Sequence, residues 1–201
     1  MAIEEYWLVD AVGGGVATLR RRELAIDVGA NVGEWTAELA RIFTRVVSYE
    51  PDSRARVRIT ESDNVTVVPA AVSSRDGQAT FFLRPDAGQN SLLEEHPIGA
   101  GSQAPAPVTA TIEVKTVSLD ASHPDGADLV KIDVEGAECD VLRGCSNNGR
   151  WGRTLFIVEC HNTRPDVAEQ LWRLGKRVEL HRHPCVTAHP GHCWLIGRPQ
   201  Q

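Results

Sequence analysis

Short apolar runs alternate with segments of helical periodicity along much of the chain. Leu24–Val28, Arg45–Tyr49 and Val65–Val68 have the composition of buried strands. The apolar residues of Glu34–Phe43 and Ser53–Thr60, which follow the first two strands, recur at helical spacing. Repeated strand–helix units of this kind predict an α/β fold, with a mostly parallel sheet covered by helices on both faces.

The middle of the chain departs from this alternation. Ala79–Leu83 and Thr109–Leu119 have β character with no helical segment between them, so they predict a β excursion from the main sheet. The intervening segment Glu94–Val108 is rich in Pro, Gly and Ala and has no periodicity. We interpret it as a flexible loop, which is either a surface tether or a lid over the site.

The alternation returns in the last third and ends in a predicted antiparallel hairpin. The expected elements are strands over 128–134 and 154–159, helices over 137–142 and 165–174, and hairpin strands over 177–181 and 193–197. Residues 4–10 predict a short amphipathic helix inside an N-terminal segment, residues 1–22. At 201 residues, we expect a single domain over residues 1–201.

Composition excludes several classes of protein. The chain is 42% hydrophobic and 24% charged, which is ordinary for a globular domain, and its longest apolar runs are too short for a membrane span. A net charge of −6 argues against nucleic acid as a partner. Five irregularly spaced cysteines and an acidic N-terminus indicate reduced thiols and a cytoplasmic protein.

The loop after the first predicted strand carries the first candidate chemistry. It has the sequence DVGANVG and leads directly into a helix. Gly29 and Gly33 allow a tight turn and a close approach to a ligand, and the start of the helix offers free N–H groups. Glu50 ends the second strand 23 residues after Asp27, where its carboxylate can accept hydrogen bonds from both ribose hydroxyls.

A dinucleotide and S-adenosylmethionine are the two candidate cofactors for this loop. A dinucleotide site has the fingerprint G-x-G-x-x-G, whereas the spacing here is G-x-x-x-G. The negative charge of Asp27 would repel a pyrophosphate and suits the cationic amino acid end of S-adenosylmethionine. A strand–turn–helix corner without any ligand is a third interpretation.

Four segments resemble FkbM-type methyltransferases: AIDVGANVGEWT, VVSYEP, LVKIDVEGAECDVLRG and FIVECHN, which together span about residues 24–162. The resemblance implies a class I Rossmann-like methyltransferase fold and methyl transfer from S-adenosylmethionine to an aliphatic hydroxyl, since known relatives act on polyketide or sugar hydroxyls. Short actinobacterial members methylate polysaccharide precursors, which favours a small-molecule or oligosaccharide acceptor. A dehydrogenase that uses NAD and a non-catalytic interaction domain are the alternatives. The residues expected to hold the donor are Asp27, Gly29, Ala30, Asn31, Gly33, Thr36, Glu50, Pro51, Ala70 and Ala71.

The second motif places a lysine inside a buried strand. Alternation along residues 128–134 puts Leu129, Lys131 and Asp133 on one face. A buried lysine is costly unless an anion pairs with it. The candidate partners are Asp27, Glu135, Glu138 and Glu159.

Asp133, Glu159 and His161 are the candidate catalytic residues, because the strand order implied by the resemblance brings them to one edge of the sheet beside Asp27. Like carboxylates repel one another unless a cation or a proton intervenes. One solution is Mg²⁺ held by Asp133 and Glu159. Another is that Lys131 neutralises one carboxylate while a second carboxylate, or His161 with an ordinary pKa of about 6.5, acts as the base. A purely structural Lys131–Glu138 ion pair is the third.

The C-terminal tail is rich in histidine and cysteine. Its candidate ligands for zinc are His181, His183, Cys185, His189, His192 and Cys193, but their spacing is looser than in structural zinc sites. The other interpretation is a hairpin loop that contributes to an acceptor pocket or to a subunit contact in a homodimer.

Overall fold

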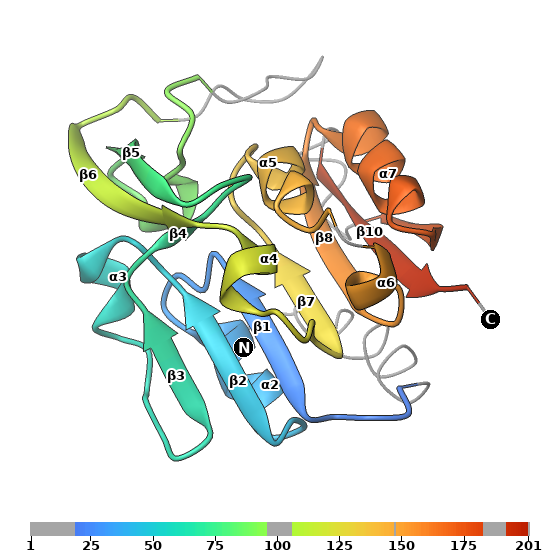
Figure 1. The fold of residues 1–201 in the computed structure, drawn as a ribbon. Helices are drawn as coiled ribbons and strands as arrows, with labels where there is room; N and C mark the ends of the chain where they lie inside the picture. The colour runs from blue at the N-terminus through green and yellow to red at the C-terminus, as the bar shows by residue number, and fades with distance from the viewer. Residues whose placement is uncertain (1–18, 96–105, 147, 183–191, 201) are drawn as a thin grey trace.

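A seven-stranded sheet runs through the molecule in the order β3-β2-β1-β7-β8-β10-β9 (Figure 1). This computed structural model describes residues 19–95, 106–146, 148–182 and 192–200. The strands of the sheet are β1 (Leu24–Val28), β2 (Arg45–Tyr49), β3 (Val65–Val68), β7 (Leu129–Ile132), β8 (Leu155–His161), β9 (Lys176–Arg182) and β10 (His192–Pro199).

Parallel and antiparallel pairing divide this sheet. The strands from β3 to β8 pair in parallel, so their carboxyl ends meet at one edge. β10 lies antiparallel between β8 and β9. The predicted parallel sheet with an antiparallel C-terminal hairpin is therefore confirmed.

Helices cover both faces of the sheet. They are α2 (Glu34–Ala40), α3 (Ser53–Arg56), α4 (Leu119–Ser122), α5 (Glu138–Arg143), α6 (Asn148–Trp151) and α7 (Arg164–Arg173). Figure 1 shows α4, α5, α6 and α7 in front of the sheet and α2 behind it. Successive residues of a strand point to opposite faces of the sheet and so belong to different apolar layers. Val130 packs in the layer that contains Leu171 of α7, and Leu129 packs in the layer that contains Leu39 of α2.

The predicted β excursion is a second, three-stranded sheet. It contains β4 (Ala71–Val72), β5 (Gly77–Leu83) and β6 (Ala110–Val117) in the order β4-β6-β5, and the 3-10 turn η1 (Ala87–Gln89) follows β5. Figure 1 shows it beyond the end of the main sheet to which the arrowheads of β2 and β3 point. Asn90 and Ser91 tie it to that edge: the Asn90 amide donates to Asp52 at 2.8 Å, and the Ser91 hydroxyl to the Glu135 carbonyl at 2.9 Å.

Two helices are shorter than the sequence predicts. The first ends at Ala40 and not at Phe43, and the second ends at Arg56 and not at Thr60. At both ends the N–H groups bond three residues back, as in Arg41 to Glu38 and Arg58 to Ala55, so the last turn tightens and the α-helix stops.

Some expectations concern residues outside the described ranges. These are the helix over 4–10, residues 96–105 of the loop 94–108, and the tail residues His183, Cys185 and His189. Among the helices of the described ranges, none is long and apolar enough to cross a bilayer.

Candidate active site

Left-handed backbone shapes the loop between β1 and α2. Gly29, Asn31 and Gly33 have φ angles of 73°, 48° and 88°. A Cβ at Gly29 would lie 1.8 Å from the Asp133 carbonyl oxygen, so only glycine lets this loop pass so close to the end of β7. The N–H groups of Gly29 and Ala30 both donate to the Tyr49 carbonyl, at 3.1 and 3.0 Å, and this fixes the loop against β2.

A buried ion pair supports the loop from beneath. Asp27 is fully buried, accepts a hydrogen bond from Thr36 Oγ1 at 2.7 Å and lies 3.1 Å from Lys131 Nζ. Lys131 also donates to the Gly29 carbonyl at 2.8 Å and lies 3.7 Å from Asp133. Burial lowers the pKa of Lys131, but Asp27 and Asp133 outweigh it and raise the pKa above its usual value. Lys131 therefore pairs with Asp27 and Asp133, and the alternative of a structural pair with Glu138 is wrong.

Glu50 closes β2 at the rim of the loop. Glu50 is 6% exposed, and its two carboxylate oxygens accept hydrogen bonds from the Asn31 N–H at 2.8 Å and the Asp52 N–H at 2.7 Å. Burial raises the pKa of Glu50 to about 7, although both backbone hydrogen bonds lower it. Each carboxylate oxygen has a second acceptor position, so Glu50 retains the capacity to bind two hydroxyl groups of a ligand.

An open cavity lies at the carboxyl edge of the sheet. Six of the residues expected to hold the donor line it: Gly29, Asn31, Glu50, Pro51, Ala70 and Ala71. Ala30 and Gly33 belong to the same loop but do not line the cavity, and neither do Asp27 and Thr36, which lie behind it. Asp27 therefore lies beneath the loop and does not line the cavity.

The β excursion supplies a wall that the sequence did not reveal. Phe81, Asn90 and Leu92 line the cavity opposite the main sheet, and Tyr49 lines it from β2. The excursion itself was predictable from its β pattern, but no local signal indicates where it packs.

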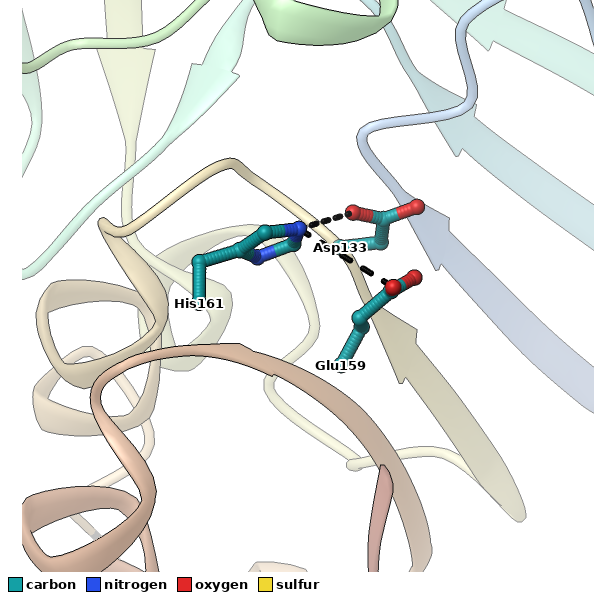
Figure 2. A group of neighbouring side chains, drawn as sticks. All are labelled: Asp133, Glu159 and His161. Atoms are coloured by element: carbon teal, nitrogen blue, oxygen red, sulfur yellow. Dashed lines mark ion pairs between the residues drawn. The ribbon is translucent and has the colours of Figure 1, made fainter. Parts of the chain in front are cut away.

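The three candidate catalytic residues come together at the same edge. The register of β7 and β8 pairs Ile132 with Val158, which puts the next residues, Asp133 and Glu159, side by side. His161 Nε2 lies 3.9 Å from a carboxylate oxygen of each, as Figure 2 shows. Ligand atoms of the three residues all lie within 4.8 Å of one another, and Asp133 also lines the cavity.

Two further carboxylates surround His161, and sequence reasoning gave neither a place at the site. Glu135 Oε1 lies 3.4 Å from His161 Nε2, and Glu138 Oε1 lies 2.9 Å from Nδ1. Burial lowers the pKa of His161, but these carboxylates raise it well above the intrinsic value of 6.5. Burial together with Asp133 raises the pKa of Glu159 to about 8.

The donor end of the cavity fits S-adenosylmethionine. Asn31 Oδ1 is buried and has no hydrogen-bond partner within the described part of the chain, so it is available to an N–H group of a ligand. Glu50 offers acceptors for hydroxyls, and Ala70, Ala71 and Phe81 form an apolar end of the kind that suits a flat base.

Comparisons with known proteins agree with this fit. The sequence matches the family described as the methyltransferase FkbM domain over residues 27–180. A hexuronic acid methyltransferase, AglP, of Haloferax volcanii is 28% identical over 176 residues, which cover 80% of this chain and 68% of the relative.

Solved structures show the same fold at low sequence identity. A methyltransferase FkbM from Methylobacillus flagellatus has a TM-score of 0.56 and 15% identity, and the match covers 90% of this chain and 45% of that one. This chain therefore spans less than half the length of that protein. Magnesium protoporphyrin IX methyltransferase from Synechocystis, solved with bound S-adenosylmethionine, has a TM-score of 0.54 and 11% identity over 98% of this chain and 81% of that one. The fold is that of a class I methyltransferase.

Proposed function

This chain belongs to the FkbM methyltransferase domain family, and we propose that it transfers the methyl group of S-adenosylmethionine to an aliphatic hydroxyl of a sugar or polysaccharide precursor. One observation carries the proposal: a single cavity is lined by Gly29 of the loop, by Glu50 at the end of β2 and by Asp133. Asp133 lies beside Glu159 and His161, so the expected donor residues and the candidate catalytic residues meet at this cavity. The relative that is named as a hexuronic acid methyltransferase supports a sugar acceptor. A polyketide-type hydroxyl is the alternative acceptor.

The donor half of the cavity would bind and orient S-adenosylmethionine. Glu50 would accept hydrogen bonds from the ribose hydroxyls, and Asn31 Oδ1 would accept one from an N–H group at the amino acid end. Ala70 and Ala71, which line the cavity, would form an apolar surface for the base. The bound cofactor supplies a methyl group that is already activated on a sulfonium ion. The protein must therefore place the acceptor oxygen in line with that methyl group and take up the hydroxyl proton.

The acceptor half carries the groups for that proton. Asp133 lines the cavity and its side chain is 28% exposed, so it is the carboxylate best placed to accept the hydroxyl proton. Glu159 lies beside it, and His161 Nε2 lies 3.9 Å from a carboxylate oxygen of each. Because an aliphatic hydroxyl is a very weak acid, a base within hydrogen-bonding distance lowers the barrier substantially.

The same residues fit Mg²⁺ as a second cofactor. Asp133 and Glu159 offer hard carboxylate oxygens, and His161 offers Nε2 in the same group of ligand atoms. An ion held there would polarise the acceptor hydroxyl and lower its pKa. We include the ion in the proposal on the chemistry of this donor set.

Two measurements test the proposed function. Isothermal titration should show binding of S-adenosylmethionine and none of NAD, and tight binding of NAD alone would overturn the proposal in favour of a dehydrogenase. Transfer of labelled methyl should then be measured for a panel of neutral glycosides, uronides and polyketide alcohols. Label on a glycoside hydroxyl supports the proposal, whereas label only on polyketide alcohols selects the alternative acceptor.

A further inference from the structure

Glu138 is a fully buried carboxylate at the start of α5 whose partners come from three segments of the chain. Oε1 accepts hydrogen bonds from the Gly136 N–H at 2.8 Å and from His161 Nδ1 at 2.9 Å. Oε2 accepts one from Thr163 Oγ1 at 2.8 Å. A buried charge is tolerated only when its hydrogen bonds are satisfied, and here each bond also fixes the segment that donates it.

The bond to His161 determines the orientation of the imidazole. Because a carboxylate can only accept, Nδ1 must carry the hydrogen, so the ring has one orientation and Nε2 faces away from α5. Nε2 then lies 3.4 Å from Glu135 and 3.9 Å from Asp133 and Glu159. The arrangement serves equally whether Nε2 faces an acceptor hydroxyl or a metal ion.

The bond to Gly136 holds the turn that carries Glu135. Glu135 and Gly136 have φ angles of 53° and 104°, and a side chain at such a φ is uncommon and costly unless its surroundings impose it. Glu138 holds this turn from within α5, and Ser91 holds it from the β excursion. The position of the turn therefore depends on the same buried carboxylate as the orientation of the imidazole.

Glu138 itself does not line the cavity, although its neighbour Ala137 does. We propose that Glu138 is the positioning residue of the acceptor site: it fixes His161 so that Nε2 faces Asp133 and Glu159, and it touches no substrate. The role in catalysis rests on the proposed function, whereas the orientation of His161 can be tested without any acceptor.

Nitrogen-15 labelling of histidine gives the test that is independent of an acceptor. In the folded protein a proton on His161 Nδ1, assigned by its absence in His161→Gln, should be protected from solvent exchange. Glu138→Met should abolish this signal, whereas Glu138→Gln should retain it, because the amide oxygen still accepts from Nδ1. A signal that persists unchanged in Glu138→Met would overturn the proposal.

Kinetics separate positioning from general destabilisation. Glu138→Met should lower kcat about 10- to 100-fold, the usual effect of losing a carboxylate that orients a functional histidine. The Kd of S-adenosylmethionine should stay within about twofold, because the donor half is untouched, and Glu138→Gln should recover most of kcat. An unchanged kcat, or a fall in donor affinity that parallels the fall in kcat, would overturn the proposal.

Asp120→Ala is the matched control. Asp120 also accepts three hydrogen bonds, two from Ser146 and one from Trp151 Nε1, but it lies away from the cavity. Its loss should lower the Tm and leave kcat unchanged.

If no acceptor in the panel is methylated, the proposed function fails while the histidine signal still decides the role of Glu138. If Glu138→Met does not fold, Glu138→Ala takes its place, since it also removes the carboxylate and adds no larger side chain, and a Nδ1 signal that persists there would overturn the proposal. Thr163→Val, which removes only the hydrogen bond to Oε2, should leave the Nδ1 proton in place.

Discussion

Replacing Glu50 with alanine should weaken the binding of S-adenosylmethionine roughly 10- to 150-fold. Glu50 is 6% exposed, so its carboxylate would bind a ligand inside the protein, where water competes poorly. A hydrogen bond to a charged group contributes about 1.5–3 kcal/mol. Since about 1.4 kcal/mol corresponds to a tenfold change in Kd, loss of one such bond gives the stated range.

A pH series distinguishes lost recognition from lost stability. Burial raises the pKa of Glu50 to about 7, so the carboxyl group is mostly protonated at acidic pH. The ionised form accepts hydrogen bonds from the ribose hydroxyls, and affinity must therefore rise as the pH rises towards 7. Between about pH 5.5 and 7.0 the ionised fraction grows from about 0.03 to about 0.5, which predicts binding about 15-fold tighter. This range stays below the pKa of about 7.7–8.0 of an amino acid ammonium group.

Isothermal titration of both proteins well below their Tm is the assay. Alanine also removes the acceptor of two backbone N–H groups, Asn31 and Asp52, so the Tm of the variant must be measured first. Glu38→Ala, which removes an exposed ion pair with Arg41 on α2, is the control and should bind like the wild type. A wild-type affinity that is independent of pH over this range would contradict this role of Glu50, and so would a Glu50→Ala variant that retains both affinity and pH dependence.

Three further predictions concern the buried supports and the ion. Gly29→Ala should lower the free energy of unfolding by more than about 2 kcal/mol, because the new Cβ meets the Asp133 carbonyl. Gly175 has a similar φ of 70°, but an added Cβ there would meet nothing within 4 Å, so Gly175→Ala should lower the free energy of unfolding clearly less. Equal losses in urea denaturation would contradict the steric explanation. Lys131→Met should cost about 3–5 kcal/mol in the same assay, since it leaves the buried Asp27 without its cation, and a cost below 1 kcal/mol would count against that pairing. Dialysis against EDTA should reduce methyl transfer and Mg²⁺ should restore it, and turnover that is insensitive to EDTA removes the ion from the mechanism.

The main sheet could be predicted from sequence because its strands are long enough to show a pattern. β4 has two residues, and α4 and α6 have four each, so none of them completes a period that could be recognised. The helix ends were wrong for a related reason. Ile42 and Phe43 continue the helical spacing, but the chain tightens into a turn there to enter β2.

The position of the site at one edge of the sheet was predictable from sequence, whereas the pairing of its side chains was not. Parallel strands bring Asp133 and Glu159 to one edge, and this follows from topology alone. The pairing of Asp27 with Lys131 depends on the register of β1 and β7, in which the two residues stand opposite each other. The place of Glu138 depends on how α5 packs beside β8, which no spacing in the sequence encodes.

The charge around His161 has a consequence for the acceptor. Asp133, Glu135, Glu138 and Glu159 approach its ring nitrogens within 2.9–3.9 Å, and Lys131 lies 3.7 Å from Asp133. Burial raises the pKa of Glu135 and Glu159, so protons relieve part of this negative charge when no metal ion is bound. A uronide would bring one more carboxylate into the same cluster, whereas a neutral glycoside would not. Chelation should therefore reduce methylation of a uronide more than methylation of the matching neutral glycoside. Equal loss with both acceptors would show that the ion acts on the hydroxyl alone.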